Sequence, residues 1–444
     1  MRTLTFPRGG IHPPDRKKTT RSLPTRNAII PRTSIVPLLQ HTGAPARAQV
    51  GPGERVHEGM LIGRAQSSDG AHVHAPTPGV VREIREIELP DGRRSLAVVI
   101  DMDGAFDRLG KEIPAQQWDS LSAEQIRGLL REHGVVSMGD APVPLHRAIL
   151  TGEQQCETLL LNGCESEPYL SADHRLMVER AEAVIAGARI VARAVAAREI
   201  VVAVEANMPD ALAAMQRQSR RARRADGASL RCVRLKVKYP QGNDRQLVKA
   251  VTGREVPTGG GPADAGVVTV DVATAKAVHD AVVLREPVVE RVLTVSGGAV
   301  AEPANIKARV GTPLVDLLRE CGGLVGVPAK IVVGGPLAGY AVTDLSTPVT
   351  KSTRGVIALT DREVHAAPRT ACIRCARCVD SCPMGLDPSR LFKLIEHEEH
   401  YQAVEEGLFD CTECGACGYI CPSRIPLVEG MRSGKERVRE QSGE

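Results

Sequence analysis

Short apolar runs separated by glycine and proline mark the first part of the chain. They cover residues 35–39, 56–63, 80–87 and 96–100, and they are rich in Val, Ile and Leu. Apolar runs of this length between turn-forming residues are typical of β-strands. We therefore expect residues 1–115 to form a small β domain.

From residue 116 the pattern changes, because apolar positions recur at helical spacing between strand-like runs. Residues 122–133 place Ile126, Leu129 and Leu130 on one helical face. This alternation predicts an α/β layer with a largely parallel sheet over residues 116–286. The expected strands are 158–161, 199–204, 230–237 and 266–270, and the expected helices are 171–197, 210–223 and 273–284.

Two smaller units follow. Residues 287–362 show the order strand, turn, strand, helix and strand, with the helix at 314–320, which predicts a β-grasp module. Residues 363–444 hold a dense set of cysteines with two helical stretches between them, 389–398 and 401–408. We expect this last unit to be a separate helical domain.

The cysteines of the last unit repeat one spacing, C-x2-C-x2-C-x3-C-P, which is the bacterial ferredoxin pattern for iron–sulfur ligation. In two-cluster ferredoxins the fourth cysteine of each repeat ligates the other cluster. The spacing therefore predicts two [4Fe–4S] clusters with exchanged fourth ligands. The ligands of cluster 1 are Cys372, Cys375, Cys378 and Cys421, and those of cluster 2 are Cys411, Cys414, Cys417 and Cys382.

Structural zinc is the alternative metal that paired cysteines could bind. A zinc ion takes four tetrahedral ligands, and zinc sites do not require a third and fourth cysteine at the spacing C-x2-C-x3-C-P. Disulfides are disfavoured, because residues 1–10 lack the apolar core of a signal peptide and we expect a reducing compartment.

Charge and hydropathy restrict the partners. The formal net charge of +4 is too small to indicate nucleic acid as a partner. The most apolar long stretch, residues 181–204, is interrupted by five charged side chains and does not have the composition of a membrane span. The sequence predicts a soluble or peripheral protein.

Two segments of the β domain, residues 50–59 and 73–81, resemble the halves of a biotinyl- or lipoyl-type barrel-sandwich hybrid. The connection 64–72 contains no lysine, so we expect the scaffold without a swinging arm. His72 and His74 would share one face of a strand. We expect surface or packing histidines, since no third metal ligand is nearby in sequence.

Taken in order, these features resemble the C subunits of Rnf-type ion-translocating oxidoreductase complexes. The resemblance covers nearly the whole chain, and the cysteine pattern is its most specific part. The matching motifs are Gly9-Gly10-Ile11-His12-Pro13-Pro14, residues 73–81, residues 162–169, Ala172-Asp173, Arg175-Leu176-Met177, Lys238-Tyr239-Pro240, Gly334-Gly335-Pro336-Leu337 and the cysteines.

The resemblance implies a multidomain α/β protein with a barrel-sandwich hybrid, a flavoprotein-like domain, a β-grasp module and a two-cluster domain. It implies a peripheral subunit on the cytoplasmic side of a bacterial inner membrane, with integral membrane and iron–sulfur subunits and ferredoxin as partners. Electrons would pass between NAD(H) and ferredoxin while the complex moves ions. FMN would lie near Gly139 and the N-x-x-E-x-E-P segment, which supplies Asn162, Glu165 and Glu167.

One loop departs from the family pattern. Where the family has G-x-G-G-A-G-F-P-T ending near a lysine, residues 137–145 read S-M-G-D-A-P-V-P-L, and Ala148 stands at the position of the lysine. Glycines in such a loop let backbone N–H groups approach a phosphate. Asp140 adds negative charge there and Pro142 removes a donor, so both changes oppose nucleotide binding.

Three hypotheses therefore remain. In the first, the chain oxidises NADH through FMN and passes single electrons through the clusters. In the second, it is an electron-relay and assembly subunit that has lost NADH and FMN binding. In the third, it is a soluble flavin-dependent reductase. The cysteines support the first two equally, and the opening from Gly9 to Pro14, which resembles the membrane-complex form, disfavours the third.

Overall fold

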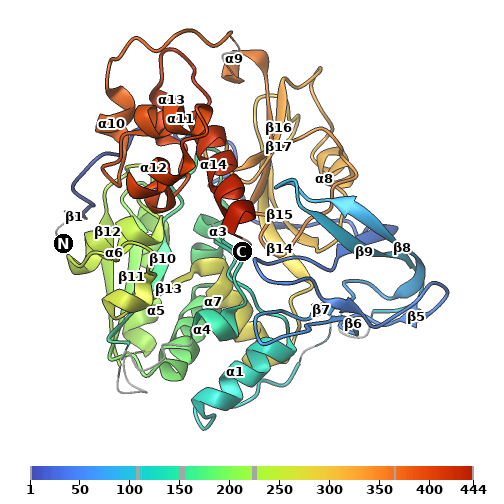
Figure 1. Ribbon diagram of the computed structural model, residues 1–444. Helices are drawn as coiled ribbons and strands as arrows, with labels where there is room; N and C mark the ends of the chain where they lie inside the picture. The colour runs from blue at the N-terminus through green and yellow to red at the C-terminus, as the bar shows by residue number, and fades with distance from the viewer. Residues whose placement is uncertain are drawn as a thin grey trace.

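A parallel sheet forms the layer around which the middle module is built (Figure 1). The computed structural model describes residues 3–106, 111, 113–139, 141–149, 156–222, 228–364 and 367–442. The described strands of this sheet run in the order β1-β12-β11-β10-β13, and each pairs with its neighbour in parallel. They are β1 (Thr3–Leu4), β12 (Ser229–Leu235), β11 (Glu199–Glu205), β10 (Thr158–Gly163) and β13 (Val267–Asp271).

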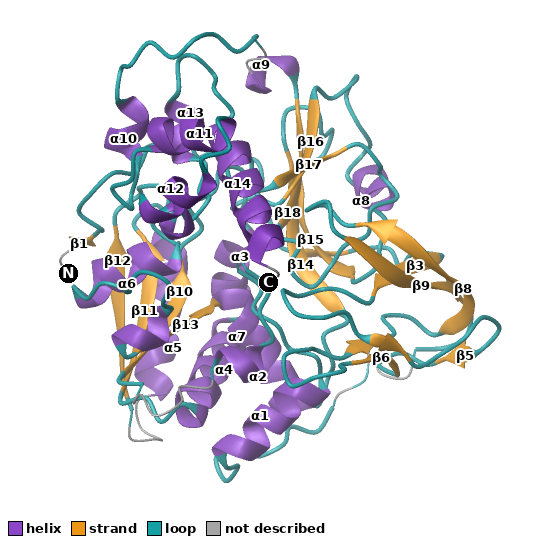
Figure 2. Ribbon diagram, in the orientation of Figure 1, coloured by secondary structure: helices purple, strands orange, loops and turns teal. Residues whose placement is uncertain are grey.

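Helices cover the strands of this sheet, as the alternating pattern predicts (Figure 2). The expected helix 171–197 is divided in two at Arg180, whose φ of −129° lies outside the helical region. Apolar periodicity does not detect a break of one residue. The helices are α1 (Ala123–Glu132), α2 (Leu145–Ala148), α3 (Ala172–Glu179), α4 (Ala181–Ala194), α5 (Pro209–Ala222), α6 (Asp244–Thr252) and α7 (Val272–His279), with short turns η1 (Pro262–Ala265) and η2 (Asp280–Leu284).

The N-terminal β module consists of two sheets that enclose a core of aliphatic side chains, among them Val36, Ile62 and Ile100. Along β9, exposed and buried positions alternate at the start, and the four residues from Ala97 to Ile100 are all buried, so both faces of the strand are covered there. The first sheet contains β3 (Thr33–Pro37), β9 (Arg94–Met102), β8 (Gly79–Glu88) and β5 (Arg55–Val56), and the second contains β4 (Arg47–Ala48), β6 (Leu61–Arg64) and β7 (Val73–His74).

The β-grasp module has a mixed sheet with α8 (Leu314–Glu320) packed on it. The predicted first two strands, β14 (Glu290–Ser296) and β15 (Ala304–Arg309), form an antiparallel hairpin. The other strands are β16 (Lys330–Val333), β17 (Tyr340–Val342) and β18 (Gly355–Leu359).

The cysteine-rich module is helical, and it packs above the α/β module in Figure 1, where it is drawn in orange to red. Two helices lie between the cysteine groups, as predicted from residues 382–411. Its helices are α10 (Arg377–Ser381), α11 (Pro388–Glu396), α12 (His400–Glu405), η3 (Leu408–Asp410), α13 (Ala416–Ile420) and α14 (Leu427–Ser442). The short helix α9 (Asp361–Val364) precedes them and packs beside β18 of the β-grasp module.

The first residues of the chain connect the modules. β1 completes the edge of the α/β sheet, whereas β2 (Arg26–Asn27) pairs with β15 of the β-grasp sheet. Between them, the backbone N–H of Gly10 donates to the carbonyl of Ser381, at 2.8 Å. The predicted domain limits of 115, 286 and 362 stay a prediction, and the N-terminal segment contributes to three modules.

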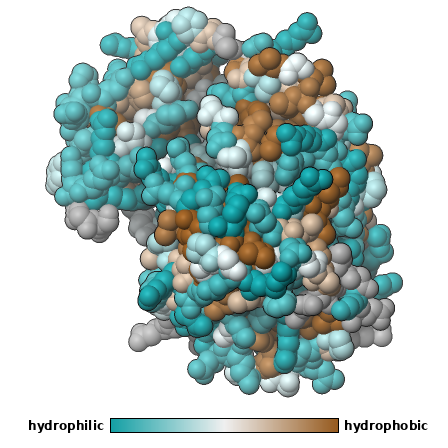
Figure 3. Space-filling view, turned by 90° about the vertical axis from the view of Figure 1, so that its right-hand side faces the viewer, coloured by the Kyte–Doolittle hydropathy of each residue, from teal (hydrophilic) through white to brown (hydrophobic). Residues whose placement is uncertain are grey.

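The described residues include no helix that has both the length and the apolar character needed to cross a membrane. On the face shown in Figure 3, apolar side chains gather in patches among polar ones. Val325 and Val327, between α8 and β16, are among the most exposed large apolar residues.

Helix packing in the α/β module depends on one glycine. A Cβ at Gly187 of α4 would lie 1.7 Å from the carbonyl oxygen of Ala275 in α7. Gly187→Ala should therefore separate the two helices and lower the free energy of unfolding by roughly 2–4 kcal/mol. Chemical denaturation of the chain measures this loss.

Gly128 of α1 is the matched control, because a Cβ there would meet nothing within 4 Å. Gly128→Ala should raise stability by about 0.5–1 kcal/mol, since alanine has the higher helix propensity. Equal effects of the two substitutions would contradict the close approach of α4 and α7.

Candidate functional site

A large cavity lies at the carboxyl ends of β10 and β13. The two strands are neighbours, and Asn162 of β10 pairs with Asp271 of β13. The chain continues from β10 to β11 on one side, while β13 lies on the other, so the cavity is at a topological switch point of the sheet. Ligands of doubly wound folds bind at this place. The cavity encloses about 670 Å³, which is in the range of cofactor sites.

Three of the four residues predicted to bind flavin line this cavity. They are Gly139, Asn162 and Glu167. Asn162 fixes the loop opposite, because its Nδ2 donates to the carbonyl of Gly242 at 2.7 Å. Glu165 is not among the lining residues: its buried carboxylate accepts from the N–H of Asp173 at 3.0 Å and stabilises the start of α3.

Glu167 joins three modules. Its carboxylate accepts from the backbone N–H groups of Leu337, at 3.1 Å, and Ala338, at 2.9 Å, both in the β-grasp module. The hydroxyl of Tyr239 lies 3.2 Å from Oε1 of Glu167. The same hydroxyl donates to the carbonyl of Cys414 in the cysteine-rich module. The wall of the cavity is thus tied directly to a predicted cluster ligand.

At the other end of the cavity, Asp271 is the N-cap residue of α7. Its Oδ1 accepts from the N–H of Thr274 at 2.8 Å, and its Oδ2 accepts from the N–H of Met138 at 3.2 Å. A Cβ on Gly139 would lie 3.4 Å from Oδ2. Ala148 lines the cavity where the family pattern has lysine. Asp140 lies outside the described residues.

The cations of the cavity wall contact neighbouring polar groups. Arg245 donates to the carbonyls of Val256 and Pro257, each at 3.1 Å. Arg354 lies 3.8 Å from Asp173. Burial, together with nearby Glu165, raises the pKa of Asp173 to about 7. The described lining contains the carboxylates of Glu167, Asp173, Asp244, Asp271, Asp410 and Glu413, against the guanidinium groups of Arg245, Arg354 and Arg432.

FMN is the cofactor that this type of domain implies, and the two ends of the cavity differ in how they fit it. The ring end has space and polar groups. The phosphate end does not fit, because a helix start attracts an anion only while its N–H groups are available. Asp271 already accepts from one of them, the N–H of Thr274, and it places a carboxylate at this helix start.

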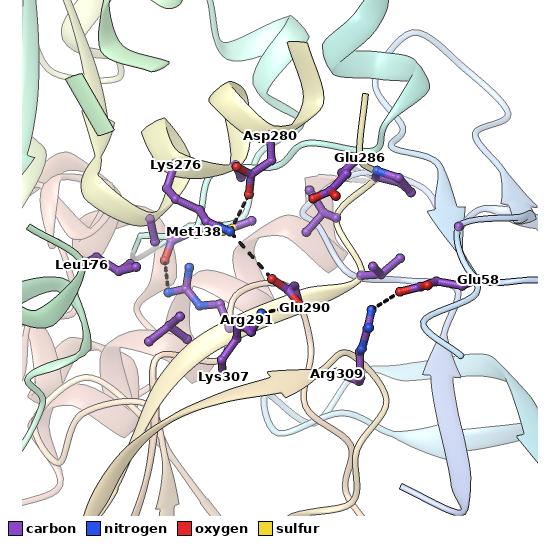
Figure 4. Close-up of a pocket in the computed structure, with 17 residues that line it drawn as sticks. Glu58, Met138, Leu176, Lys276, Asp280, Glu286, Glu290, Arg291, Lys307 and Arg309 are labelled. Atoms are coloured by element: carbon purple, nitrogen blue, oxygen red, sulfur yellow. Dashed lines mark hydrogen bonds and ion pairs between the residues drawn. The ribbon is translucent and has the colours of Figure 1, made fainter. Parts of the chain in front are cut away.

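A second, smaller cavity of about 200 Å³ lies behind this end, where the barrel, α/β and β-grasp modules meet (Figure 4). Buried Arg291 of β14 donates from Nη2 to the carbonyl of Met138 at 3.1 Å. Across the cavity, Arg309 pairs with Glu58 of the barrel at 2.6 Å. The first contact fixes the loop before Gly139 to the β-grasp sheet, and the second fixes the barrel to that sheet.

The four thiols assigned to cluster 2, Cys382, Cys411, Cys414 and Cys417, line one small cavity. Burial and the neighbouring thiols raise the pKa of Cys414 to about 12. A thiolate in such a place needs a cationic partner, which iron supplies. The residues present therefore fit a cluster. Cys411 and Cys414 also line the large cavity, so the two cavities share a wall.

The cysteines assigned to cluster 1 lie nearer the surface. Cys372 and Cys375 are exposed, and Cys378 and Cys421 are half-buried. The N–H of Thr370 donates to the carbonyl of Ser423 at 3.0 Å, which brings the first cysteine loop beside the residues after Cys421. Among the described residues, no three His, Cys, Asp or Glu side chains are grouped to hold a single metal ion. The assignment of ligands to clusters stays a prediction.

Three residues that line these cavities or contact their walls were not predicted as site residues from the sequence. Asp271 ends a predicted strand at the ligand-binding edge of the sheet, and that position was the available signal. Tyr239 was noted only as part of a motif. Lys435 gave no signal, yet it is 7% exposed and donates to the carbonyl of Cys411 at 2.6 Å and to Glu413 at 2.7 Å.

Four family models match successive parts of the chain. The RnfC barrel sandwich hybrid domain matches residues 4–105, and the Nuo51 FMN-binding domain matches residues 130–280. The SLBB domain matches residues 292–341, and the 4Fe-4S dicluster domain matches residues 371–425. These matches confirm the predicted fold classes of the four modules.

A solved structure of an NAD+-reducing [NiFe]-hydrogenase in the H2-reduced state shares the fold. Its TM-score is 0.51 and its sequence identity 18%, over 73% of this chain and 67% of that chain.

Curated relatives cover almost the whole chain. The C subunit of the proton-translocating ferredoxin:NAD(+) oxidoreductase complex of Clostridium ljungdahlii is 39% identical over 97% of this chain and 94% of its own length. The C subunit of the ion-translocating oxidoreductase complex of Rhodobacter capsulatus is 38% identical over 98% of this chain and 83% of its own length. The chain therefore belongs to the family of C subunits of Rnf-type ion-translocating oxidoreductase complexes.

Proposed function

We propose that the chain is the peripheral iron–sulfur subunit of a membrane-bound Rnf-type complex, on the cytoplasmic side of the inner membrane. The complex would couple electron transfer between ferredoxin and NAD(H) to ion translocation. Integral membrane and iron–sulfur subunits of the complex would be its partners. The names of the relatives and the dicluster domain support this function.

One observation carries the proposal: Cys411 and Cys414 line both the thiol cavity and the large α/β cavity. Bound [4Fe–4S] clusters supply one-electron transfer. Tyr239 and Glu167 hold the Cys414 loop against the α/β module, so the distance between the cavities is fixed. The exposed Cys372 and Cys375 place the other cluster site where a partner protein can approach it.

A second candidate function is an electron-relay and assembly subunit that binds neither FMN nor NADH. The capped start of α7 and Ala148 at the phosphate end favour it. In this function the second cluster would receive electrons from a protein, and the α/β module would serve as a scaffold.

Purification through a tag on this chain tests the proposed function. Isolation from membranes of its own host should yield integral membrane subunits together with the chain, and anaerobic metal analysis should find about eight irons per chain. Cys414→Ser should remove the signal of one cluster in electron paramagnetic resonance. Zinc in place of iron, or a chain recovered without membrane subunits, would refute the function.

NADH addition to the reconstituted chain separates the two candidates. Bleaching of flavin and cluster absorbance supports the dehydrogenase. If NADH bleaches the cluster absorbance in the whole complex but not in the isolated chain, the result supports the relay.

Lys435 should raise the reduction potential of the second cluster, because a buried cation beside Cys411 stabilises the added electron. We expect Lys435→Met to lower that potential by tens of millivolts in a redox titration followed by paramagnetic resonance. Lys435→Arg should keep the potential, since it keeps the charge. Lys393→Met, at an exposed site on α11, should change neither potential. A fall with Lys435→Arg equal to that with Lys435→Met would show a packing effect instead.

A further inference from the structure

We propose that the large cavity binds an uncharged flavin of the riboflavin class in preference to FMN or NAD(H). The inference rests on the proposed function in one respect, namely that the cavity adjoins the second cluster site. It concerns which ligand the cavity accepts.

The contacts of Asp271 oppose the binding of a phosphate group at the start of α7. A helix start binds phosphate through its free N–H groups. In α7 the N–H of Thr274 donates to Oδ1 of Asp271, and the N–H of Met138, in the preceding loop, donates to Oδ2. A phosphate here would have to displace these bonds and stand beside a carboxylate. Like charges in direct proximity reduce affinity by about tenfold or more.

The nearby cations reduce this repulsion only in part. Arg291 lies behind the loop and donates to the carbonyl of Met138, so it offsets some of the Asp271 charge. Arg354 lies 3.8 Å from Asp173, and Arg432 pairs with Glu413 at 3.2 Å. The described lining still contains more carboxylates than guanidinium groups, and a phosphate would add further negative charge to it.

The ring end of the cavity has the volume and the aromatic lining that an uncharged flavin requires. The volume of about 670 Å³ accommodates a ligand of that size. Tyr239 and Tyr340 line it with aromatic surface, and Asn162 also lines it. A neighbouring cavity of about 180 Å³ shares Gly139, Glu167 and Tyr340 with it, which leaves space for a sugar-alcohol chain. A flavin without phosphate would use all of this and avoid Asp271.

Titration of the anaerobically reconstituted full chain with riboflavin and with FMN tests the inference. Quenching of flavin fluorescence at low ionic strength gives both dissociation constants. We expect riboflavin to bind about tenfold more tightly than FMN or better. Equal binding, or tighter binding of FMN, overturns the inference. Binding of neither flavin also overturns it, whereas iron content in the same sample reports separately on the proposed function.

Ala148→Lys adds a cation at the phosphate end. Ala148 is exposed on α2, so the longer side chain does not disturb the core. FMN affinity should rise about tenfold while riboflavin affinity stays the same. Asp271→Asn should act in the same direction, and the fold should persist because asparagine also caps helices.

Gly128→Lys on exposed α1 is the charge-matched control, since it adds the same net charge away from the cavity. It should leave the ratio of the two affinities as in the wild type. If Ala148→Lys and Asp271→Asn both leave that ratio unchanged, the phosphate is not what the cavity discriminates, and the inference fails.

Discussion

The buried carboxylate of Glu167 is the constraint on which the arrangement of the modules depends. A buried carboxylate is costly unless donors surround it. Its backbone donors, Leu337 and Ala338, come from the β-grasp module, and the hydroxyl of Tyr239, from a distant loop of the α/β module, lies 3.2 Å from Oε1. Space is equally restricted, because a Cβ on Gly335 would lie 2.2 Å from Cδ of Glu167. The modules can therefore satisfy this charge in one relative position only.

The N-terminal segment imposes a second constraint on the same place. Ile11 and Tyr239 exchange backbone hydrogen bonds of 2.9 Å, so the segment holds the loop that carries the Tyr239 hydroxyl. A Cβ on Gly9 would lie 2.3 Å from the carbonyl oxygen of Cys382. This close approach explains why a segment far away in sequence bears on a cluster ligand. Loops that bind clusters have little core of their own, and here they gain rigidity from three neighbouring modules.

Elements with a strong period could be predicted from the sequence, and contacts between modules could not. The strands β10, β11 and β13 are mostly buried apolar runs in a parallel sheet, and the cysteine spacing indicates iron–sulfur ligation directly. Glu165 and Glu167 look equivalent in the motif, but the backbone turns one toward α3 and the other toward the β-grasp loop. The backbone break at Arg180 and the contacts of Lys435 with Cys411 and Glu413 leave no trace in local periodicity.

The fold of this chain and its ability to recognise phosphate depend on different residues. The parallel sheet, the switch point and the shared cavity wall require apolar strands and a few glycines, and all of these are present. Phosphate recognition requires only free N–H groups and one or two cations, so it can be lost through Asp271 and Ala148 while the core stays intact. Glu167, by contrast, is linked to the loop of Cys414 through Tyr239, whose hydroxyl lies 3.2 Å from Oε1 and donates to the carbonyl of Cys414. Selection for electron transfer would therefore keep the wall between the cavities even where selection for nucleotide binding has ended.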